Sequence, residues 1–126
     1  MRVAIFGAGG YIGRRLMRAL ERRHMEVAPY SSGDAGIFEP DSGLLHADVT
    51  LASGTECVIY LSQSPRFRQM PDQAAHMWAV NVVSALRAAT LARHCGARRF
   101  IYASTGNVYA PSFDPLSETD AVQRDN

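Results

Sequence analysis

The sequence predicts an α/β fold with a doubly wound parallel sheet of about five strands, in the order 3-2-1-4-5, and helices on both faces. Three observations predict it. Short apolar runs, typical of strands buried on both faces, alternate with amphipathic helical segments. The first run ends in a glycine cluster that opens a helix. The 126 residues, 47% hydrophobic and 20% charged, suit one domain with one core.

The first third of the chain predicts two strands with a helix between them. Residues 3–6 form a short apolar run, which predicts the first strand. In residues 11–23 apolar side chains recur on one helical face and arginines fill the other, which predicts an amphipathic helix. Residues 25–30 predict the second strand, although Pro29 removes a donor from its ladder.

The rest of the chain predicts three more strands, at residues 44–47, 56–61 and 99–103. Residues 62–72 are polar and contain two prolines, which predicts a loop. Residues 73–95 are rich in alanine and free of glycine and proline, which predicts the longest helix, ended by Gly96. We expect residues 1–126 to form a single domain, with residues 110–126 as a turn-rich tail.

Charge and cysteine content exclude several classes of partner. The net charge is +1, from 13 Lys+Arg and 12 Asp+Glu, and no long block of like charge provides a surface for nucleic acid or anionic lipid. No apolar run is long enough for a membrane span, and no signal peptide is recognised. Cys57 and Cys95 stand apart among apolar residues, so we expect buried thiols in a reducing compartment, hence the cytoplasm, and no metal site.

The glycine cluster fits the spacing G-x-x-G-x-x-G at Gly7, Gly10 and Gly13. Glycine allows a positive φ and lets a pyrophosphate approach the backbone, while the N–H groups of the following helix stabilise its charge. The position after the first strand indicates dinucleotide binding, and a simple tight turn is the alternative. A P-loop is excluded because Arg14 and Arg15, and no Lys-Ser/Thr pair, follow Gly13. A response-regulator-like domain is disfavoured because glycine replaces clustered acidic residues there.

Hydroxyl side chains follow the last predicted strand, at the edge where ligands of open α/β sheets bind. With these residues in place, the chain resembles the extended short-chain dehydrogenases, the NAD-dependent epimerase/dehydratase family, over residues 2 to about 119. The resemblance is carried, in order, by the glycine cluster, Asp48-Val49-Thr50, Val58-Ile59-Tyr60-Leu61, Asn81-Val82, Phe100-Ile101-Tyr102-Ala103-Ser104-Thr105 and Val108-Tyr109.

The resemblance implies a Rossmann-like domain that binds NAD or NADP. It assigns the pyrophosphate to Gly7, Gly10, Tyr11, Ile12 and Gly13, the adenine to Asp48 and Val49, and the rest of the cleft to Ser31, Ser32, Leu61, Ser62, Gln63, Asn81 and Ser104. It also matches Thr105 to the residue that hydrogen-bonds the reacting sugar hydroxyl. Each role has an alternative: Asp48 as a turn or cap residue, Asn81 as an ordinary polar helix residue, and Thr105 as a strand-end hydroxyl bound to backbone.

Two departures from the family bear on the choice of cofactor and on catalysis. Ser31 and Ser32 stand where NAD-preferring members have an acidic residue, so the choice between NAD and NADP is open. Arg14 or Arg15 would serve a 2′-phosphate, or would form a solvated helix face. The family's Tyr-x-x-x-Lys acid/base pair is missing, since all 13 basic residues are arginine.

We therefore expect the cofactor-binding half of a nucleotide-sugar epimerase or dehydratase, inactive alone. The alternative is a non-catalytic dinucleotide-binding or protein-interaction module. A dinucleotide and a nucleotide sugar are the expected small-molecule partners. We also expect a homo-oligomer, because residues 99–103 would form an open sheet edge and the long helix would expose apolar residues among Met77, Val80, Val83, Leu86 and Leu91, unless residues 110–126 cover them.

Overall fold

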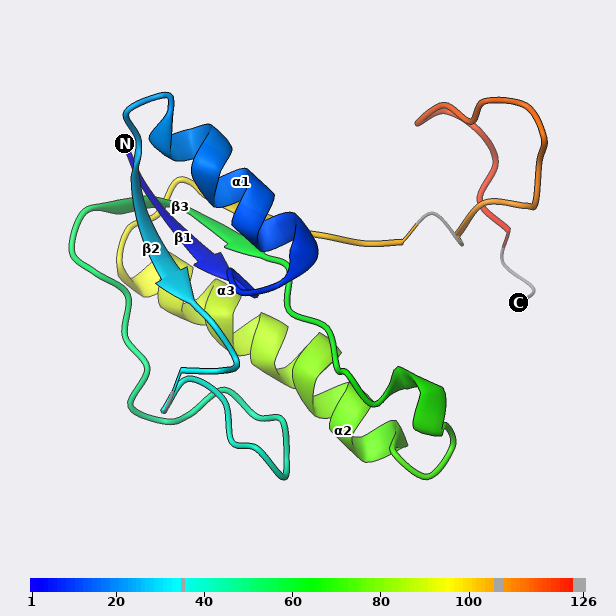
Figure 1. The fold of residues 1–126 in the computed structure, drawn as a ribbon, viewed down its shortest axis with the longest axis horizontal. Coiled ribbons are helices and arrows are strands. Elements are labelled where there is room, and N and C mark those ends of the chain that lie inside the picture. The colour runs from blue at the N-terminus through cyan, green and yellow to red at the C-terminus, as the bar shows by residue number, and fades with distance from the viewer. Residues whose placement is uncertain (35, 106–107, 124–126) are drawn as a thin grey trace.

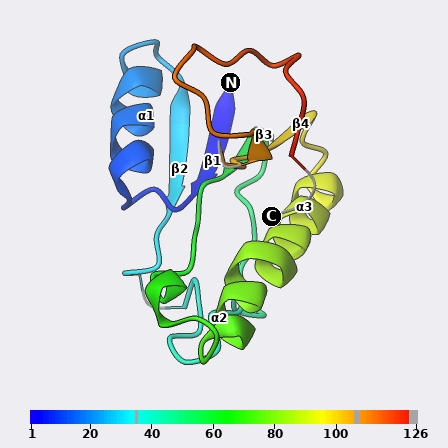
Figure 2. The same ribbon diagram turned by 90° about the vertical axis from the view of Figure 1, so that its right-hand side faces the viewer.

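A parallel sheet with helices on both faces forms the body of the computed structural model (Figures 1 and 2), which describes residues 1–34, 36–105 and 108–123. The strands are β1 (Arg2–Phe6), β2 (Glu26–Tyr30), β3 (Thr55–Tyr60) and β4 (Arg99–Tyr102), and their order is β2-β1-β3-β4. All three pairings are parallel. The carboxyl ends of the strands therefore meet at one edge, as the sequence predicts.

The helices divide between the two faces of the sheet. Helix α1 (Tyr11–Glu21) covers one face (Figure 2). On the other face α3 (Ser84–His94) packs against β3 and β4. It continues, without a break, from α2 (Ala74–Trp78) and the π-helical segment η2 (Ala79–Val83), and α2 extends past the carboxyl ends of the strands (Figure 2). A short 3-10 helix, η1 (Phe67–Gln69), lies in the loop before α2. The single long helix predicted for residues 73–95 is thus found, with a π-helical segment in its middle.

The prediction of five strands is not confirmed, because residues 44–47 form no strand. Leu45 makes only an isolated antiparallel bridge, with Phe38. The neighbouring backbone groups are also used locally, since Glu39 N–H donates to the Leu44 carbonyl and His46 N–H to the Ile37 carbonyl. Residues 37–46 are therefore a small hairpin, and the order is 2-1-3-4 instead of 3-2-1-4-5. The four strands that form keep their predicted relative order.

The hairpin is tied to the helical layer by Ser84, the first residue of α3. The hydroxyl of Ser84 accepts a hydrogen bond from Leu45 N–H at 2.8 Å and donates to the Gly43 carbonyl at 3.2 Å. Ser84 is buried, so these bonds are shielded from water. They satisfy the backbone groups that a further strand would otherwise have used.

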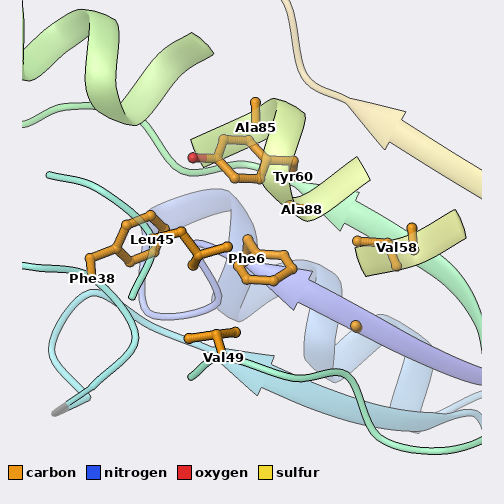
Figure 3. Close-up of a cluster of buried hydrophobic side chains, with 10 residues drawn as sticks. Phe6, Phe38, Leu45, Val49, Val58, Tyr60, Ala85 and Ala88 are labelled. Carbon is orange, nitrogen blue, oxygen red and sulfur yellow. The ribbon is translucent and has the colours of Figure 1, made fainter. Parts of the chain in front are cut away.

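Two hydrophobic clusters fill the space between the sheet and its helices. The larger joins β1 and β3 to α3 and the hairpin (Figure 3), and contains Phe6, Val58, Tyr60 and Ala88 among its buried members. The rings of Phe6 and Tyr60 have centroids 5.8 Å apart. The smaller cluster, with Val3, Ile5, Cys57 and Ile59 at its centre, packs against α1. Alternate residues of β1 thus face opposite layers, which explains its uninterrupted apolar sequence.

The described part of the tail stands apart from this body (Figure 1). Tyr109 forms an isolated antiparallel bridge with Val122, and Gln123 N–H donates to the Val108 carbonyl. Residues 110–123 are all exposed. The predicted tail also includes residues 124–126, which lie outside the described residues.

Candidate functional site

Two adjoining cavities lie at the carboxyl ends of the strands. The larger, about 420 Å³, is lined by Gly7, Gly10, Ser32, Phe38, Glu39, Pro40, Gly43, Leu61, Ser62, Gln63, Pro65, His76 and Val80. The smaller, about 320 Å³, is lined by Ile12, Leu61, Ser62, Gln63, Asn81, Tyr102, Ala103, Ser104 and Thr105. Residues 61–63, which follow β3 directly, line both. The cavities therefore meet at the end of a central strand.

The glycine cluster forms the wall of the larger cavity at the end of β1. Gly7 has a φ of +84°, and a Cβ there would lie 2.8 Å from the Leu61 carbonyl carbon and the Ser62 nitrogen. A Cβ on Gly13 would lie 2.3 Å from the Gly7 carbonyl oxygen. Two of the three motif glycines are thus required by close backbone packing, which brings the loop, β3 and α1 together.

Gly10 differs from the other two because its missing side chain leaves cavity space. Its backbone is extended, with φ −73° and ψ 173°, and the nearest atom to a built Cβ is the Gly7 carbonyl oxygen at 3.2 Å. Gly10 is also the N-cap of α1, where no side chain caps the helix and no acidic residue occupies the first turn. The N–H groups of the first turn are therefore available to an anion.

The arginines that follow the glycine cluster line neither cavity. A guanidinium nitrogen of Arg14 donates to the Gly9 carbonyl at 2.8 Å. The Arg15 guanidinium lies 3.6 Å from the centre of the Tyr11 ring. Both guanidinium groups thus lie on the surface of the loop and of α1. This agrees with the alternative that the two arginines form a solvated helix face.

Ser62 has the clearest unfilled hydrogen-bonding capacity in the site. Its Oγ is buried and has no hydrogen-bond partner among the described residues. Ser62 lines both cavities, so the residue lies at their junction, while its Oγ is covered by the protein. Leaving a buried hydroxyl without a partner is costly, so Ser62 is the residue at this junction whose hydrogen-bonding capacity the described protein atoms do not use.

Asn81 combines a structural role with a place in the smaller cavity. Its side-chain oxygen accepts a hydrogen bond from Ser64 N–H at 3.1 Å. Its backbone carbonyl accepts one from the Tyr102 hydroxyl at 3.1 Å, and the Val80 carbonyl accepts one from Tyr60 at 2.5 Å. Both carbonyls belong to η2, whose π-helical geometry departs from the usual bonding ladder. The π-helical segment thus anchors β3 and β4 to the helical layer.

The remaining predicted residues are divided between the cavities and the protein body. Ser32 lines the larger cavity, and Ser104 and Thr105 line the smaller. Ser31 lines neither, and its N–H is bound by the Asp34 carboxylate at 3.2 Å.

Asp48 and Val49 are not brought to either cavity. The side chain of Asp48 is 91% exposed, and its carboxylate lies 3.5 Å from His46 Nδ1. This position agrees with the alternative interpretation of Asp48 as a turn residue. Val49 is buried in the larger hydrophobic cluster. Their contact with adenine stays a prediction.

A buried polar pair at the larger cavity, Ser64 and His76, was not predicted from the sequence. Ser64 and His76 are 1% and 8% exposed, and Ser64 Oγ lies 2.8 Å from His76 Nδ1. Ser64 Oγ also accepts a hydrogen bond from Arg66 N–H at 3.1 Å. Burial lowers the pKa of His76, and the charge of Arg66 lowers it further, so the imidazole is held neutral. No motif signals this pair, because a loop and a helix bring it together.

The tyrosines of the sheet serve packing. Tyr60 is 1% exposed, and burial raises its pKa far above the usual range of a phenol. Burial also raises the pKa of Tyr30, whose hydroxyl donates to the Thr50 carbonyl at 2.9 Å. Neither hydroxyl is therefore suited to exchange protons near neutral pH.

Comparison with known families agrees with this geometry. The model of the NAD-dependent epimerase/dehydratase family matches residues 3–125. The chain belongs to this family. No curated protein matches the chain significantly.

Solved structures share the fold of this family member. A short-chain dehydrogenase/reductase superfamily protein from Agrobacterium tumefaciens, with bound NAD, is 24% identical, with a TM-score of 0.70 over 98% of this chain and 39% of its own. UDP-glucose 4-epimerase from Thermus thermophilus, in complex with NAD, is 21% identical, with a TM-score of 0.71 over 98% and 44%. RMD from Pseudomonas aeruginosa, complexed with NADPH, is 22% identical, with a TM-score of 0.65 over 97% and 42%. The family member therefore spans about two fifths of the length of these proteins.

The described part of the chain shows neither a membrane-spanning helix nor a metal-binding cluster. Among the described residues, no helix has the length and apolar character that a membrane span requires. The same residues contain no group of three His, Cys, Asp or Glu side chains arranged to hold a metal ion.

Proposed function

We propose that the chain binds a nicotinamide dinucleotide, NAD or NADP, across the two cavities. The observation that carries the proposal is the junction of the cavities, which residues 61–63 line and which lies beside the glycine loop, since Gly7 and Gly10 line the larger cavity. The extended backbone at Gly10 and the uncapped first turn of α1 suit the pyrophosphate. The family supports the same assignment.

The two cavities then hold the two ends of the dinucleotide. Ser32 borders the larger cavity, which we assign to the adenosine end. Asn81, Ser104 and Thr105 border the smaller cavity, which we assign to the nicotinamide end. When bound, the nicotinamide ring supplies hydride transfer, and the protein positions it. Ser62 and Gln63 bind near the middle, because they line both cavities.

Calorimetry with NAD⁺, NADH, NADP⁺ and NADPH tests this binding. Gly10→Val should abolish it, because the backbone conformation of Gly10 accepts valine while the new side chain enters the cavity. Ala121→Val, on the exposed tail, is the matched control and should bind like the unmodified chain. Wild-type affinity in a folded Gly10→Val variant would refute the assignment of the pyrophosphate.

We further propose that the whole protein acts on a nucleotide sugar, with Thr105 placed to hydrogen-bond the reacting hydroxyl. Thr105 lines the smaller cavity at the end of β4, which supports this role. The 126 residues contain no lysine, so the Tyr-x-x-x-Lys pair that the family uses for acid/base chemistry is not among them. Turnover then requires such a pair from outside this sequence. A non-catalytic dinucleotide-binding module is the second candidate, favoured by the same missing pair.

We also propose that the protein self-associates and that it is located in the cytoplasm. β4 is an edge strand whose Ile101 and Tyr102 are exposed, and Trp78, Val83 and Leu86 are exposed on the long helix. Among the five apolar residues from which exposure was expected, Val83 and Leu86 are exposed, Met77 and Leu91 are half-buried, and Val80 is buried. The described tail does not cover the helix (Figure 1). We therefore expect a dimer or larger assembly by light scattering, and a concentration-independent monomer would refute this.

A further inference from the structure

The larger cavity has an acidic wall that the sequence analysis did not anticipate. Among the described residues that line it, Glu39 and His76 are the only titratable ones. His76 is held neutral, as described above, so Glu39 supplies the charge. Glu39 lies in the hairpin of residues 37–46, on the same cavity as Ser32 and the glycine loop.

The carboxylate of Glu39 is fixed by its own hairpin. Its Oε2 accepts a hydrogen bond from the Ser42 hydroxyl at 2.7 Å. The backbone N–H of Glu39 donates to the Leu44 carbonyl, and its carbonyl accepts from Gly43 N–H, both at 2.8 Å. Ser84 then ties the hairpin to α3. A charged group held in this way acts on a ligand from a defined position.

The nearby cations are committed elsewhere. Arg14 donates to the Gly9 carbonyl, and Arg15 stacks on Tyr11. Arg66 donates to Gln73 Oε1 at 2.9 Å and to the Pro40 carbonyl at 3.2 Å. None of the three lines the cavity, whereas a second carboxylate, Asp34, binds Ser31 N–H at the end of β2. Among the described residues that line the larger cavity, Glu39 therefore carries the one formal charge.

We propose that Glu39 makes the larger cavity selective for NAD over NADP, an inference that rests on the proposed dinucleotide binding. The two cofactors differ only at the adenosine ribose, where NAD has a 2′-hydroxyl and NADP a 2′-phosphate. A carboxylate accepts a hydrogen bond from the hydroxyl. It repels the phosphate, which carries nearly two negative charges at neutral pH.

Calorimetry at low ionic strength, with NAD⁺ and NADP⁺ on the full chain, tests the proposal. The unmodified chain should bind NAD⁺ at least about tenfold more tightly than NADP⁺. Glu39→Gln should reduce this ratio to about threefold or less, mainly by improving NADP⁺ binding, and Glu39→Arg should reverse it. Glu118→Gln, on the exposed tail, is the matched control and should leave the ratio unchanged.

The outcomes separate this inference from the proposed function. Equal affinity for both nucleotides in the unmodified chain, or an unchanged ratio in a folded Glu39→Gln variant, overturns the inference alone. A ratio that collapses in Asp34→Asn and not in Glu39→Gln assigns selectivity to Asp34 and also overturns it. If neither nucleotide binds, the proposed function is overturned together with it.

Discussion

A paired substitution in the glycine loop separates what this loop does for folding from what it does for binding. The test compares Gly13→Ala with Gly10→Ala. Gly13 lies inside α1, where alanine favours the helix by about 1 kcal/mol over glycine. However, its Cβ would lie 2.3 Å from the Gly7 carbonyl oxygen, 2.7 Å from the Ala8 carbonyl oxygen and 2.8 Å from Ala8 Cα. These are backbone atoms, which move only if the loop moves.

The expected cost follows from these distances. Overpacking costs about 1–3 kcal/mol when side chains can adjust, and a backbone clash lies at or above the top of that range. After the gain in helix propensity, Gly13→Ala should lower the free energy of unfolding by about 2 kcal/mol. With an unfolding entropy of about 2.1 cal/mol/K per residue, this loss lowers the Tm of a 126-residue chain by about 8 °C.

Gly10→Ala should affect binding more than folding. Its Cβ meets a single atom at 3.2 Å, and alanine is a poorer N-cap than glycine by about 0.5–1 kcal/mol, so the Tm should fall by about 2–4 °C, less than for Gly13→Ala. The methyl group occupies space in the larger cavity, so the affinity for the dinucleotide should fall. Thermal unfolding and calorimetry on both variants measure the two effects. Equal Tm values for Gly13→Ala and the unmodified chain would refute the packing argument.

Three further predictions concern the core, the buried histidine and catalysis. Tyr60→Phe should lose about 1–2 kcal/mol of stability in urea denaturation, since the Val80 carbonyl loses its buried donor, whereas Tyr11→Phe on the surface should lose little. Since the pKa of His76 is lowered in the fold, stability should be full above the usual histidine pKa of 6.5 and fall as the pH drops below it. His76→Asn should weaken this pH dependence, and an unchanged slope would contradict the account. The 126 residues alone should turn over no nucleotide sugar at enzymatic rates, and product formation by a sample of confirmed mass would contradict this.

Local sequence predicts those strands and helices in which the pattern of buried and exposed side chains is regular. β1 and β3 pack against both helical layers, so their apolar runs are unambiguous. α1 has a polar face toward solvent, which gives it a clear period. Residues 44–47 are also apolar, but Leu45 is buried by the hairpin and by Ser84 instead of by strand pairing. Burial alone therefore did not distinguish a strand from a buried loop.

The same reasoning explains which site residues the sequence could predict. Gly7 and Gly10 follow β1 directly, and residues 61–63 follow β3, so the strand ends bring them to the cavities, whereas Gly13 lines neither and packs against the backbone of the loop. Glu39 and His76 reach the larger cavity from a hairpin and from α2, and only the tertiary fold brings them there. The Val80 and Asn81 carbonyls of the π-helical segment likewise accept hydrogen bonds from the Tyr60 and Tyr102 hydroxyls, and no local pattern encodes these long-range contacts.

The missing strand and the acidic cavity wall have the same structural cause. A strand at residues 44–47 would lie beside β2 at the sheet edge, and its backbone groups would pair with that strand. Instead, the bridge between Phe38 and Leu45 and the bonds to Ser84 turn residues 37–46 back toward α3. This turn is what places Glu39 on the cavity.

Ser84→Ala should therefore loosen the hairpin as well as remove a buried hydrogen bond. If Glu39 sets the choice of cofactor, Ser84→Ala should also weaken the preference for NAD, although residue 84 lines neither cavity. An intact preference in a folded Ser84→Ala variant would show that the hairpin holds Glu39 without this anchor.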